Sequence, residues 1–311
     1  MENCMKTPIK HRHMKTSSHP LRNAWIHVIL AAGSLCCLVP FVLVVIISFT
    51  EEKAILQNGY SFFPARWSLA AYRYLLADFS GIVRGYMITI LVTLTGTLAH
   101  LIIGSMLAYT LSRRDYPYRG LLSFFVFFTM LFNGGLVPWY LVYSNFLHIK
   151  DSVFALIVPN LMLSGFNVMV MRTFFQNSIP PSLIESAYLD GAGEFQIYRK
   201  IVVPLSRPVL ATVGFMVVLN YWNDWYNSLV FMTNDKTVSL QYLMTKVLLN
   251  IQALKAQQSQ MTPDMLKALG NMPSESIRMA MAVVGAGPML LIFPFFRKYL
   301  VSGLTIGAVK G

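Results

Sequence analysis

Residues 24–50 read AWIHVILAAGSLCCLVPFVLVVIISFT, an apolar run without Asp, Glu, Lys or Arg. A helix needs roughly 20 such residues to cross the hydrocarbon core of a bilayer, so this stretch is long enough to span a membrane. It is too long for the apolar part of a signal peptide and lacks a clear small-residue cleavage site. We therefore interpret it as a retained first span of an integral membrane protein.

The rest of the chain has the same apolar character. Hydrophobic residues make up 55% of the 311 residues and charged residues 12%, and the mean hydropathy is +0.55. Soluble domains carry about twice this charged share. Further apolar runs predict an all-α integral membrane fold with six transmembrane helices, at about 24–50, 85–111, 120–148, 153–171, 208–232 and 277–296. These spans form one transmembrane domain, 24–302, between an N-terminal tail, 1–23, and a C-terminal tail, 303–311.

Breakers interrupt the third apolar run. Asn133-Gly134-Gly135 and Pro138 lie inside it, and such residues are tolerated at membrane depth where neighbouring helices satisfy the freed backbone groups. The third span is therefore predicted to be kinked or broken.

The distribution of basic residues sets the predicted orientation. The net charge is +12, and short loops on the cytoplasmic side of a membrane are rich in Lys and Arg. The N-terminal tail, the loop 112–119, the segment 172–207 and the residues after 296 together hold 15 of the 25 Lys and Arg residues. We therefore predict that both termini are cytoplasmic and that the loops 51–83 and 233–276 are external, in a multi-pass protein of a bacterial cytoplasmic membrane.

Several classes of function lack their residues in this sequence. No soluble basic module interleaved with aromatics suggests nucleic-acid binding, and no G-x-x-x-x-G-K-[ST] loop suggests nucleotide hydrolysis by that route. The cysteines and histidines show no metal or catalytic spacing. They are Cys4, Cys36 and Cys37, and His11, His13, His19, His27, His100 and His148. We predict a chain without a catalytic site, metal or cofactor of its own. A membrane-embedded enzyme and a secondary transporter remain alternatives, although ion coupling needs ionisable groups deep in the membrane and only Asp224 lies near such a position.

The segment 179–204, between the predicted fourth and fifth spans, predicts two short helices joined by a bend. Ser182 is a plausible N-cap with Glu185 at the capping-box spacing. Gly191 can adopt the left-handed conformation that ends a helix. A second short helix is predicted from about Gly193 to Val202, ending at Pro204.

The spacing in this segment resembles the EAA loop of binding-protein-dependent ABC importer permeases. The family pattern is E-A-A, three residues, G, nine residues, I-x-L-P. This chain has Glu185-Ser186-Ala187, then Gly191, then Ile201-Val202-Val203-Pro204, so that Ser186 replaces an alanine and Val203 a leucine. Three other stretches resemble the carbohydrate-uptake branch of the family, in particular maltose-type second permeases and lipoprotein-named oligosaccharide permeases: AYTLSR at 108–113, NGGLVP at 133–138 and GLTIGAVKG at 303–311. The similarity covers nearly the whole chain.

The resemblance implies a transport function and a set of partners. The chain would be a permease subunit that imports a carbohydrate, with an oligosaccharide favoured over other solutes. ATP would be bound and hydrolysed by two copies of a cytoplasmic ATPase. The other partners would be a second, different permease subunit and an external solute-binding protein that determines which sugar enters.

The resemblance also implies which residues contact the ATPase. The coupling helix would dock through Glu185, Ala187, Asp190 and Gly191, with Tyr188 and Leu189 as apolar contacts, and with Ser186, Ala192 and Pro204 completing the motif. The tail would reach the ATPase dimer through Gly303, Thr305, Gly307 and Lys310.

Polar residues recur in the predicted fifth span. Asn220, Asn223, Asp224 and Asn227 have helical spacing and are predicted to share one face, beside Trp222 and Trp225. Aromatic rings next to amides suit a sugar, and polar groups in a span face the inside of a bundle. Pairing with neighbouring spans or water is the alternative for these residues. The external loop 233–276 is a second candidate contact surface, for the solute-binding protein.

Overall fold

The computed structural model describes residues 20–257, 262 and 272–308. Apart from one bridge pair between Thr50 and Trp67, the regular structure in these ranges is helical. The α-helices, in chain order, are α1 (Pro20–Ser48), α2 (Glu52–Asn58), α3 (Ala70–Leu76), α4 (Phe79–Ser112), α5 (Arg119–Leu131), α6 (Leu136–Leu141), α7 (Phe154–Ile157), α8 (Gly165–Ser178), α9 (Pro181–Leu189), α10 (Glu194–Ile197), α11 (Val203–Leu205), α12 (Arg207–Trp222), α13 (Tyr226–Phe231), α14 (Leu240–Ala256) and α16 (Ser274–Ala308).

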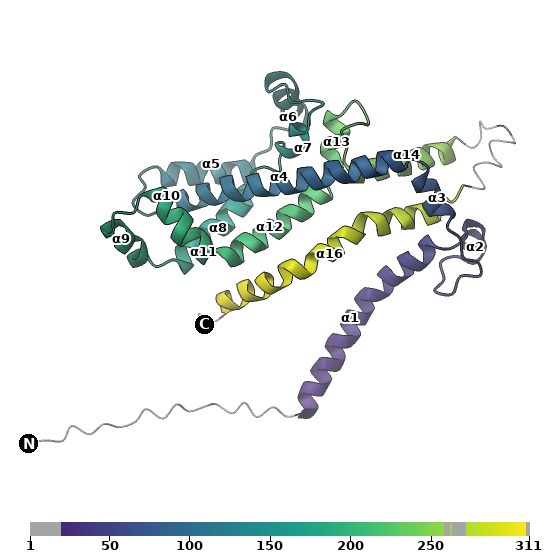
Figure 1. Cartoon of the computed structure of the whole chain (residues 1–311), viewed down its shortest axis with the longest axis horizontal. Helices are drawn as coiled ribbons and strands as arrows, with labels where there is room; N and C mark the ends of the chain where they lie inside the picture. The colour runs from purple at the N-terminus through teal and green to yellow at the C-terminus, as the bar shows by residue number, and fades with distance from the viewer. Residues whose placement is uncertain (1–19, 258–261, 263–271, 309–311) are drawn as a thin grey trace, which may run out of the picture.

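Helix α4 is the centre of an elongated bundle (Figure 1). It packs against α8 and α12, while α16 packs against α12 and α1. Small and polar residues let the helices approach α4 closely, as membrane helix interfaces require. The buried small or polar residues of α4 are Gly85, Thr89, Thr93, Gly96, Thr97, His100, Gly104, Ser105 and Ala108.

A buried histidine joins α4 to the neighbouring segments. His100 is 1% exposed, and its Nδ1 lies 2.7 Å from the carbonyl oxygen of Leu161. The Asn167 amide nitrogen, on α8, lies 3.0 Å from Nε2 of the same ring. A neutral imidazole with its proton on Nδ1 satisfies both contacts, so His100 has a packing role here.

Three described helices are long and apolar enough to cross a membrane. They lie within α1 (Trp25–Ser48), α4 (Phe79–Ser112) and α16 (Ser274–Pro294). Two bent helix pairs raise the number to five if each pair counts as one span. α5 and the helix Leu136–Phe146 meet at 117°, and Glu194–Leu205 meets α12 at 80°. The first bend falls at Asn133-Gly134-Gly135, where Gly135 has a φ of 84°, as the prediction of a broken third span requires.

Two predicted spans differ from the helices observed. The stretch 153–171 is not one helix, because α7 ends at Ile157 and α8 begins at Gly165. Pro159 lacks a backbone donor and Asn160 has a left-handed φ of 62°, so the chain turns there although it stays apolar. The last helix also continues past the predicted end at 296, to Ala308.

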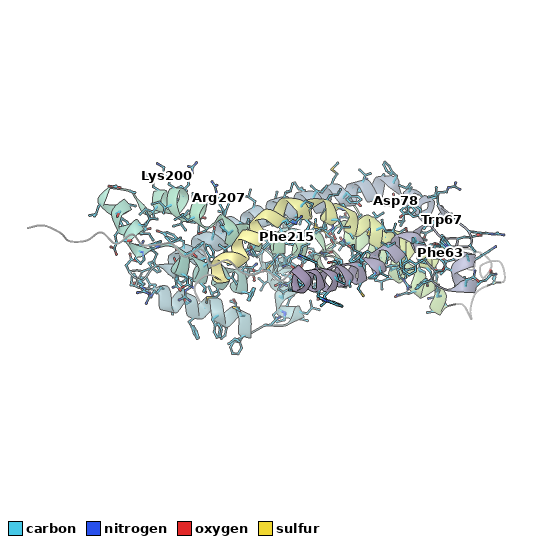
Figure 2. The ribbon with its side chains drawn as sticks, turned by 90° about the horizontal axis from the view of Figure 1, so that it is seen from below. Phe63, Trp67, Asp78, Lys200, Arg207 and Phe215 are labelled. Carbon is cyan, nitrogen blue, oxygen red and sulfur yellow. The ribbon has the colours of Figure 1, made fainter. Side chains whose placement is uncertain are left out.

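The bundle has two chemically different ends. Figure 2 places Lys200 and Arg207 toward one end, Phe63, Trp67 and Asp78 toward the other, and Phe215 between them. Phe63 is 90% exposed and Trp67 66% exposed. Helices α9 and α10 lie at the first end, and α2 and α3 at the second (Figure 1).

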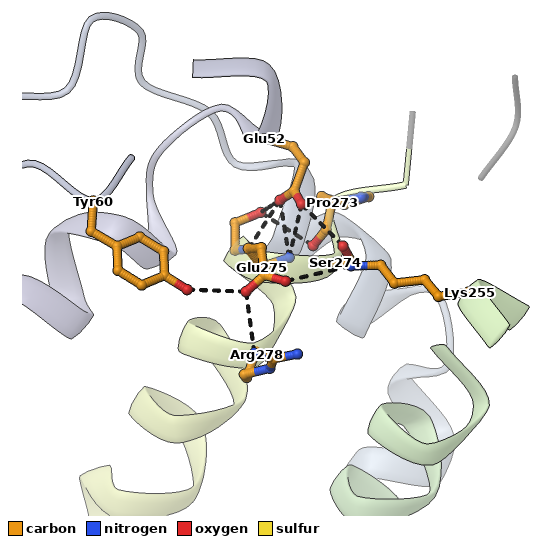
Figure 3. Close-up of polar contacts among 8 residues, drawn as sticks. Glu52, Tyr60, Lys255, Pro273, Ser274, Glu275 and Arg278 are labelled. Carbon is orange, nitrogen blue, oxygen red and sulfur yellow. Dashed lines mark hydrogen bonds and ion pairs between the residues drawn. The ribbon is translucent and has the colours of Figure 1, made fainter. Parts of the chain in front are cut away.

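A buried carboxylate closes the second end of the bundle (Figure 3). Glu52, in α2, is 6% exposed and accepts hydrogen bonds from the backbone N–H groups of Glu275 and Ser276, at 2.9 and 3.1 Å. The hydroxyls of Ser274 and Ser276 add bonds of 3.1 and 3.2 Å. Glu52 therefore caps the N-terminus of α16 from a helix more than 200 residues away, where the helix dipole favours a negative charge.

Candidate functional site: the α9–α10 loop

Helix α9 begins with two prolines. Pro180 is the flanking residue with extended backbone, Pro181 is the first helical residue, and no side chain caps the helix. The predicted capping box of Ser182 and Glu185 is therefore wrong. Proline suits the first helical position because its φ is already helical and its missing N–H would have no partner there, so Ser182 falls inside the helix.

The end of α9 follows the predicted glycine termination. Gly191 has a φ of 78°. The N–H of Gly191 donates to the carbonyl of Tyr188 and that of Ala192 to the carbonyl of Ala187, both at 2.9 Å. This pair of bonds is a Schellman motif, which satisfies carbonyls at the helix end. A Cβ added at Gly191 would meet nothing within 4 Å, so the backbone is open to an approaching surface.

The second short helix is less regular than predicted, begins at Glu194 rather than Gly193 and continues past the predicted end. It consists of α10, a π-helical turn at Tyr198–Val202 and α11, and it ends at Leu205 rather than at Pro204. Pro204 lies in the first turn of α11. The sharp bend into α12 follows at Ser206.

Helix α9 has a narrow inner face and a broad outer one. Ala187 is 8% exposed and packs with Ile184 and Ala192 into the main core. The residues Glu185, Ser186, Leu189 and Asp190 are exposed, Leu189 by 90%. The outer face of α9 therefore presents an exposed leucine close to two exposed carboxylates. Ala187, predicted as a docking residue, packs toward the bundle, and its role in docking stays a prediction.

The hydroxyl of Tyr188 belongs to a polar cluster with Glu194, Arg113 and Tyr109, which the sequence did not predict. Its hydroxyl donates to the Glu194 carboxylate, and the Arg113 guanidinium donates to the Tyr188 oxygen at 3.1 Å. Burial and the bond to Glu194 raise the pKa of Tyr188 to about 12. Tyr109, at the end of α4, donates to the second Glu194 oxygen at 2.6 Å.

Arg113 also binds the next turn of the chain. It donates two bonds to Asp115, at 2.9 and 2.6 Å, and these bonds hold the pKa of that carboxyl below its usual range. The sequence indicated Arg113 only as a basic residue of the loop 112–119, and Tyr109 only as part of the stretch 108–113. Glu194 carried no signal beyond its place in the first turn of a short helix, so the cluster could not be found from spacing.

The predicted tail contacts lie partly outside the described residues. Gly303, Thr305 and Gly307 are in the last turns of α16, which is helical to Ala308. Lys310 lies outside the residues that the structure describes. The role of this tail stays a prediction.

The predicted polar face of the fifth span is wrong in its geometry. α12 ends at Trp222, and α13 starts only at Tyr226. The Asp224 carboxylate accepts the backbone N–H groups of Tyr226 and Asn227, at 3.1 and 3.2 Å, so it caps a new helix. A capping aspartate competes with continued helix, and the helical spacing therefore does not hold.

The five predicted solute-path residues separate into two groups. Trp222 and Asn227 are buried, and they donate to the carbonyls of Gly285 and Pro159 at 2.9 and 3.3 Å. They therefore pair with neighbouring segments. Asn220 and Asn223 are exposed. The fifth residue, Asp224, is intermediate in exposure and caps α13.

A large cavity lies at the other end of the molecule. Its volume is about 870 Å³, and residues of α3, α4, α14 and α16 line it. The predicted solute-path residues are not among those that line it.

The family of the chain follows from its sequence. Residues 100–306 match the model of the binding-protein-dependent transport system inner membrane component. The chain belongs to this family. The matched range includes α9, the Schellman turn, the bend before α12 and most of α16.

Named relatives of this permease family cover most of the chain. The polygalacturonan/rhamnogalacturonan transport system permease protein YtcP of Bacillus subtilis is 35% identical over 92% of this chain and 97% of its own length. The protein LplC of the same organism is 32% identical over 88% of this chain and 90% of its own. The crystal structure of a bacterial ABC transporter that imports the acidic polysaccharide alginate contains a chain with a TM-score of 0.74 and 27% identity, covering 94% of this chain and 99% of that one.

Proposed function

We propose that this chain is a permease subunit of an ATP-driven importer that moves an oligosaccharide across the bacterial cytoplasmic membrane. The apolar helices α1, α4 and α16 suit a membrane-spanning role. The names of the relatives, among them a polygalacturonan/rhamnogalacturonan transport system permease protein, support a carbohydrate as the solute. The chain itself hydrolyses no ATP in this proposal and acts as a non-catalytic subunit.

The observation that carries the proposal is the shape of the α9–α10 loop. A short helix with an exposed leucine, two exposed carboxylates and an open glycine backbone lies at one tip of the bundle. Such a rigid, protruding helix suits a groove in a cytoplasmic ATPase. Closure of an ATPase dimer would then favour one of two arrangements of the spans, since a partner shifts a conformational equilibrium by its differential affinity.

The proposal includes a topology and a set of partners. The chain has six spans, with both termini and α9 on the cytoplasmic side. The fourth span then consists of α7, the turn at Pro159 and α8. The partners are a second permease subunit, two ATPase copies and an external solute-binding protein that meets the 233–276 side of the molecule.

A direct solute contact is confined to the exposed residues near the α12–α13 break. Asn220 and Asn223 offer amides, and Trp225, which is 40% exposed, offers a ring. Rings and amides together suit sugar faces and hydroxyls. Uptake kinetics unchanged by Asn220→Ala and Asn223→Ala would place the solute path elsewhere.

The first experiment is affinity purification of the tagged full chain from native membranes in mild detergent, with mass spectrometry of the proteins that co-purify. We expect an ATP-binding-cassette ATPase and a second permease. The solute-binding protein of the same system, added back to the complex, identifies the sugar through ligand-dependent stimulation of ATP hydrolysis. A chain that purifies alone and transports without ATP would be a secondary carrier and would contradict the proposal.

A further inference from the structure

Three parts of the bundle meet at the carboxylate of Glu194, the first residue of α10. Tyr109 comes from the last turns of α4, Tyr188 from the last turn of α9, and each hydroxyl donates to a different oxygen of this carboxylate. Tyr109 is only 7% exposed. Hydrogen bonds to an ionised acceptor are about twice as strong as bonds between neutral groups. The two bonds to Glu194 therefore link α4, α9 and α10, and we call this contact the Glu194 joint.

Arg113 strengthens this joint from the end of α4. Its side chain is 13% exposed, and the guanidinium lies 5.3 Å from the centre of the Tyr188 ring and 3.9 Å from a Glu194 oxygen. The bidentate pair with Asp115 fixes its orientation. Arginine stacked on a ring and paired with a carboxylate is held in one geometry.

Without these side chains, the backbone between α9 and α10 would transmit a movement of α9 poorly, because it contains two glycines. Gly191 and Gly193 flank Ala192 there, and a Cβ at either glycine would meet nothing within 4 Å. Glycine backbones absorb changes in φ and ψ at little cost. A displacement of α9 would therefore be taken up by this turn unless α9 is tied directly to a long helix.

Room for movement exists beside the joint. A cavity of about 420 Å³ lies against the Glu194 cluster and is lined by Tyr109, Arg113 and Glu194 together with Met106, Phe195 and Tyr198. Side chains next to such a space can change their arrangement without a clash, whereas a close-packed interface cannot.

We propose that Glu194 is a positioning residue that transmits displacement of α9 to α4, through Tyr188, Tyr109 and Arg113. This inference rests on the proposed role of α9 as the helix that docks on the ATPase. Because α4 packs against α8 and α12, a push on α9 reaches the centre of the bundle through this joint.

The test uses the complete importer with its ATPase and second permease, in a version free of Cys4, Cys36 and Cys37. A bimane fluorophore on Met87→Cys, a position 64% exposed in α4, reports movement of α4 when MgADP–vanadate traps the ATPase dimer. We expect Glu194→Ala to reduce the trapping-dependent change in bimane emission roughly three-fold or more, while the ATPase still co-purifies and hydrolyses ATP. A double variant with Tyr188→Phe should be no worse than Glu194→Ala alone, because residues in one network are not additive.

Matched variants separate coupling from stability. Tyr116→Phe removes a hydroxyl that lines the same cavity and is expected to leave the signal unchanged, and Glu194→Gln, which keeps an acceptor oxygen, should restore part of it. A full bimane response in Glu194→Ala, or no response in the unmodified complex, would overturn the inference. An ATPase that fails to bind the unmodified chain would instead overturn the proposed function.

Discussion

At the scale of single residues, Gly191 ends α9, the proposed docking helix, in a conformation that other residues adopt only with strain. Its φ of 78° and the empty space around its Cα mean that a side chain would be strained and would also project toward whatever approaches α9. The conformational strain itself is modest, about 1–2 kcal/mol. The steric effect on a docked partner would be larger.

We therefore expect Gly191→Asp to abolish transport and ATPase co-purification while the chain still inserts into the membrane. Gly59→Asp is the control, since Gly59 also has a positive φ, of 73°, and nothing within 4 Å of an added Cβ. Gly59→Asp should lower the thermal midpoint in detergent at least as much as Gly191→Asp, because Gly59 also has a ψ of −166°, a combination that residues other than glycine rarely adopt. Normal uptake by Gly191→Asp would refute the docking role of the loop.

Gly96 has the opposite environment. A Cβ at this position would clash with the ring of Tyr221, whose hydroxyl donates to the carbonyl of Ile157 at 2.8 Å. Tyr221 is 1% exposed and cannot move aside. The glycine is therefore required by packing between α4 and α12.

Gly96→Ala is expected to destabilise the chain by about 1–3 kcal/mol through overpacking, measured as a lower unfolding midpoint in detergent. Gly33→Ala serves as the control, because a Cβ there meets nothing within 4 Å and alanine favours helix over glycine. Equal midpoints for the two variants would show that the Tyr221 contact is not tight.

At the scale of elements, the end of the bundle opposite α9 is held together by the Glu52 carboxylate, in α2, which caps the N-terminus of α16. A second carboxylate lies beside it. Glu275, the second residue of α16, accepts a hydrogen bond of 3.0 Å from the Tyr60 hydroxyl and forms an ion pair with Lys255 at 3.4 Å (Figure 3). The end of α14 and the start of α16 are thus held together, and Glu52 attaches α2 to the same point. Removing Glu52 would leave the backbone N–H groups of Glu275 and Ser276 and the Ser274 hydroxyl without this acceptor, whereas the Ser276 hydroxyl also reaches the Pro273 carbonyl at 3.2 Å.

Glu52→Ala should therefore destabilise the chain by about 2 kcal/mol or more, since each buried unsatisfied group costs about 1–3 kcal/mol. Glu51→Ala is a neighbouring control, because the Glu51 carboxylate makes only a 3.9 Å contact with the exposed Arg66. Thermal unfolding of the purified chain distinguishes them. A loss no larger in Glu52→Ala than in Glu51→Ala would contradict the capping role.

At the scale of the whole molecule, the two ends of the bundle are proposed to face opposite compartments. Leu189, in α9, and Phe63, near α2, are both 90% exposed. In the chain expressed without its ATPase, which is proposed to cover Leu189, only the membrane should therefore keep a reagent from either position. In a version free of the native cysteines, a membrane-impermeant maleimide on intact spheroplasts should label Phe63→Cys and spare Leu189→Cys. Inside-out vesicles should give the reverse pattern. Labelling of both positions from one side would refute the proposed orientation.

The breaks between helices could be read from the sequence only in part. Asn133-Gly134-Gly135 marked the bend after α5 because two adjacent glycines weaken a helix in any context. Asn160 and Asp224 did not indicate in the sequence the breaks that the structure has after α7 and after α12. Their effect depends on a local backbone turn and on capped N–H groups that compete with an otherwise apolar, helix-compatible stretch.

The sequence by itself determined the all-helical membrane class, the break at Asn133-Gly134-Gly135 and the glycine that ends α9. These features follow from local chemistry, namely the length of apolar runs and the backbone freedom of single residues. Only the tertiary structure decided which side chains meet: Glu52 with Ser274 and Ser276, and Tyr109 with Glu194. Periodicity indicates the buried face of one helix, but contacts between helices depend on how the helices cross and where each one ends. The pairing that would carry force from α9 to α4 was therefore beyond the reach of spacing alone.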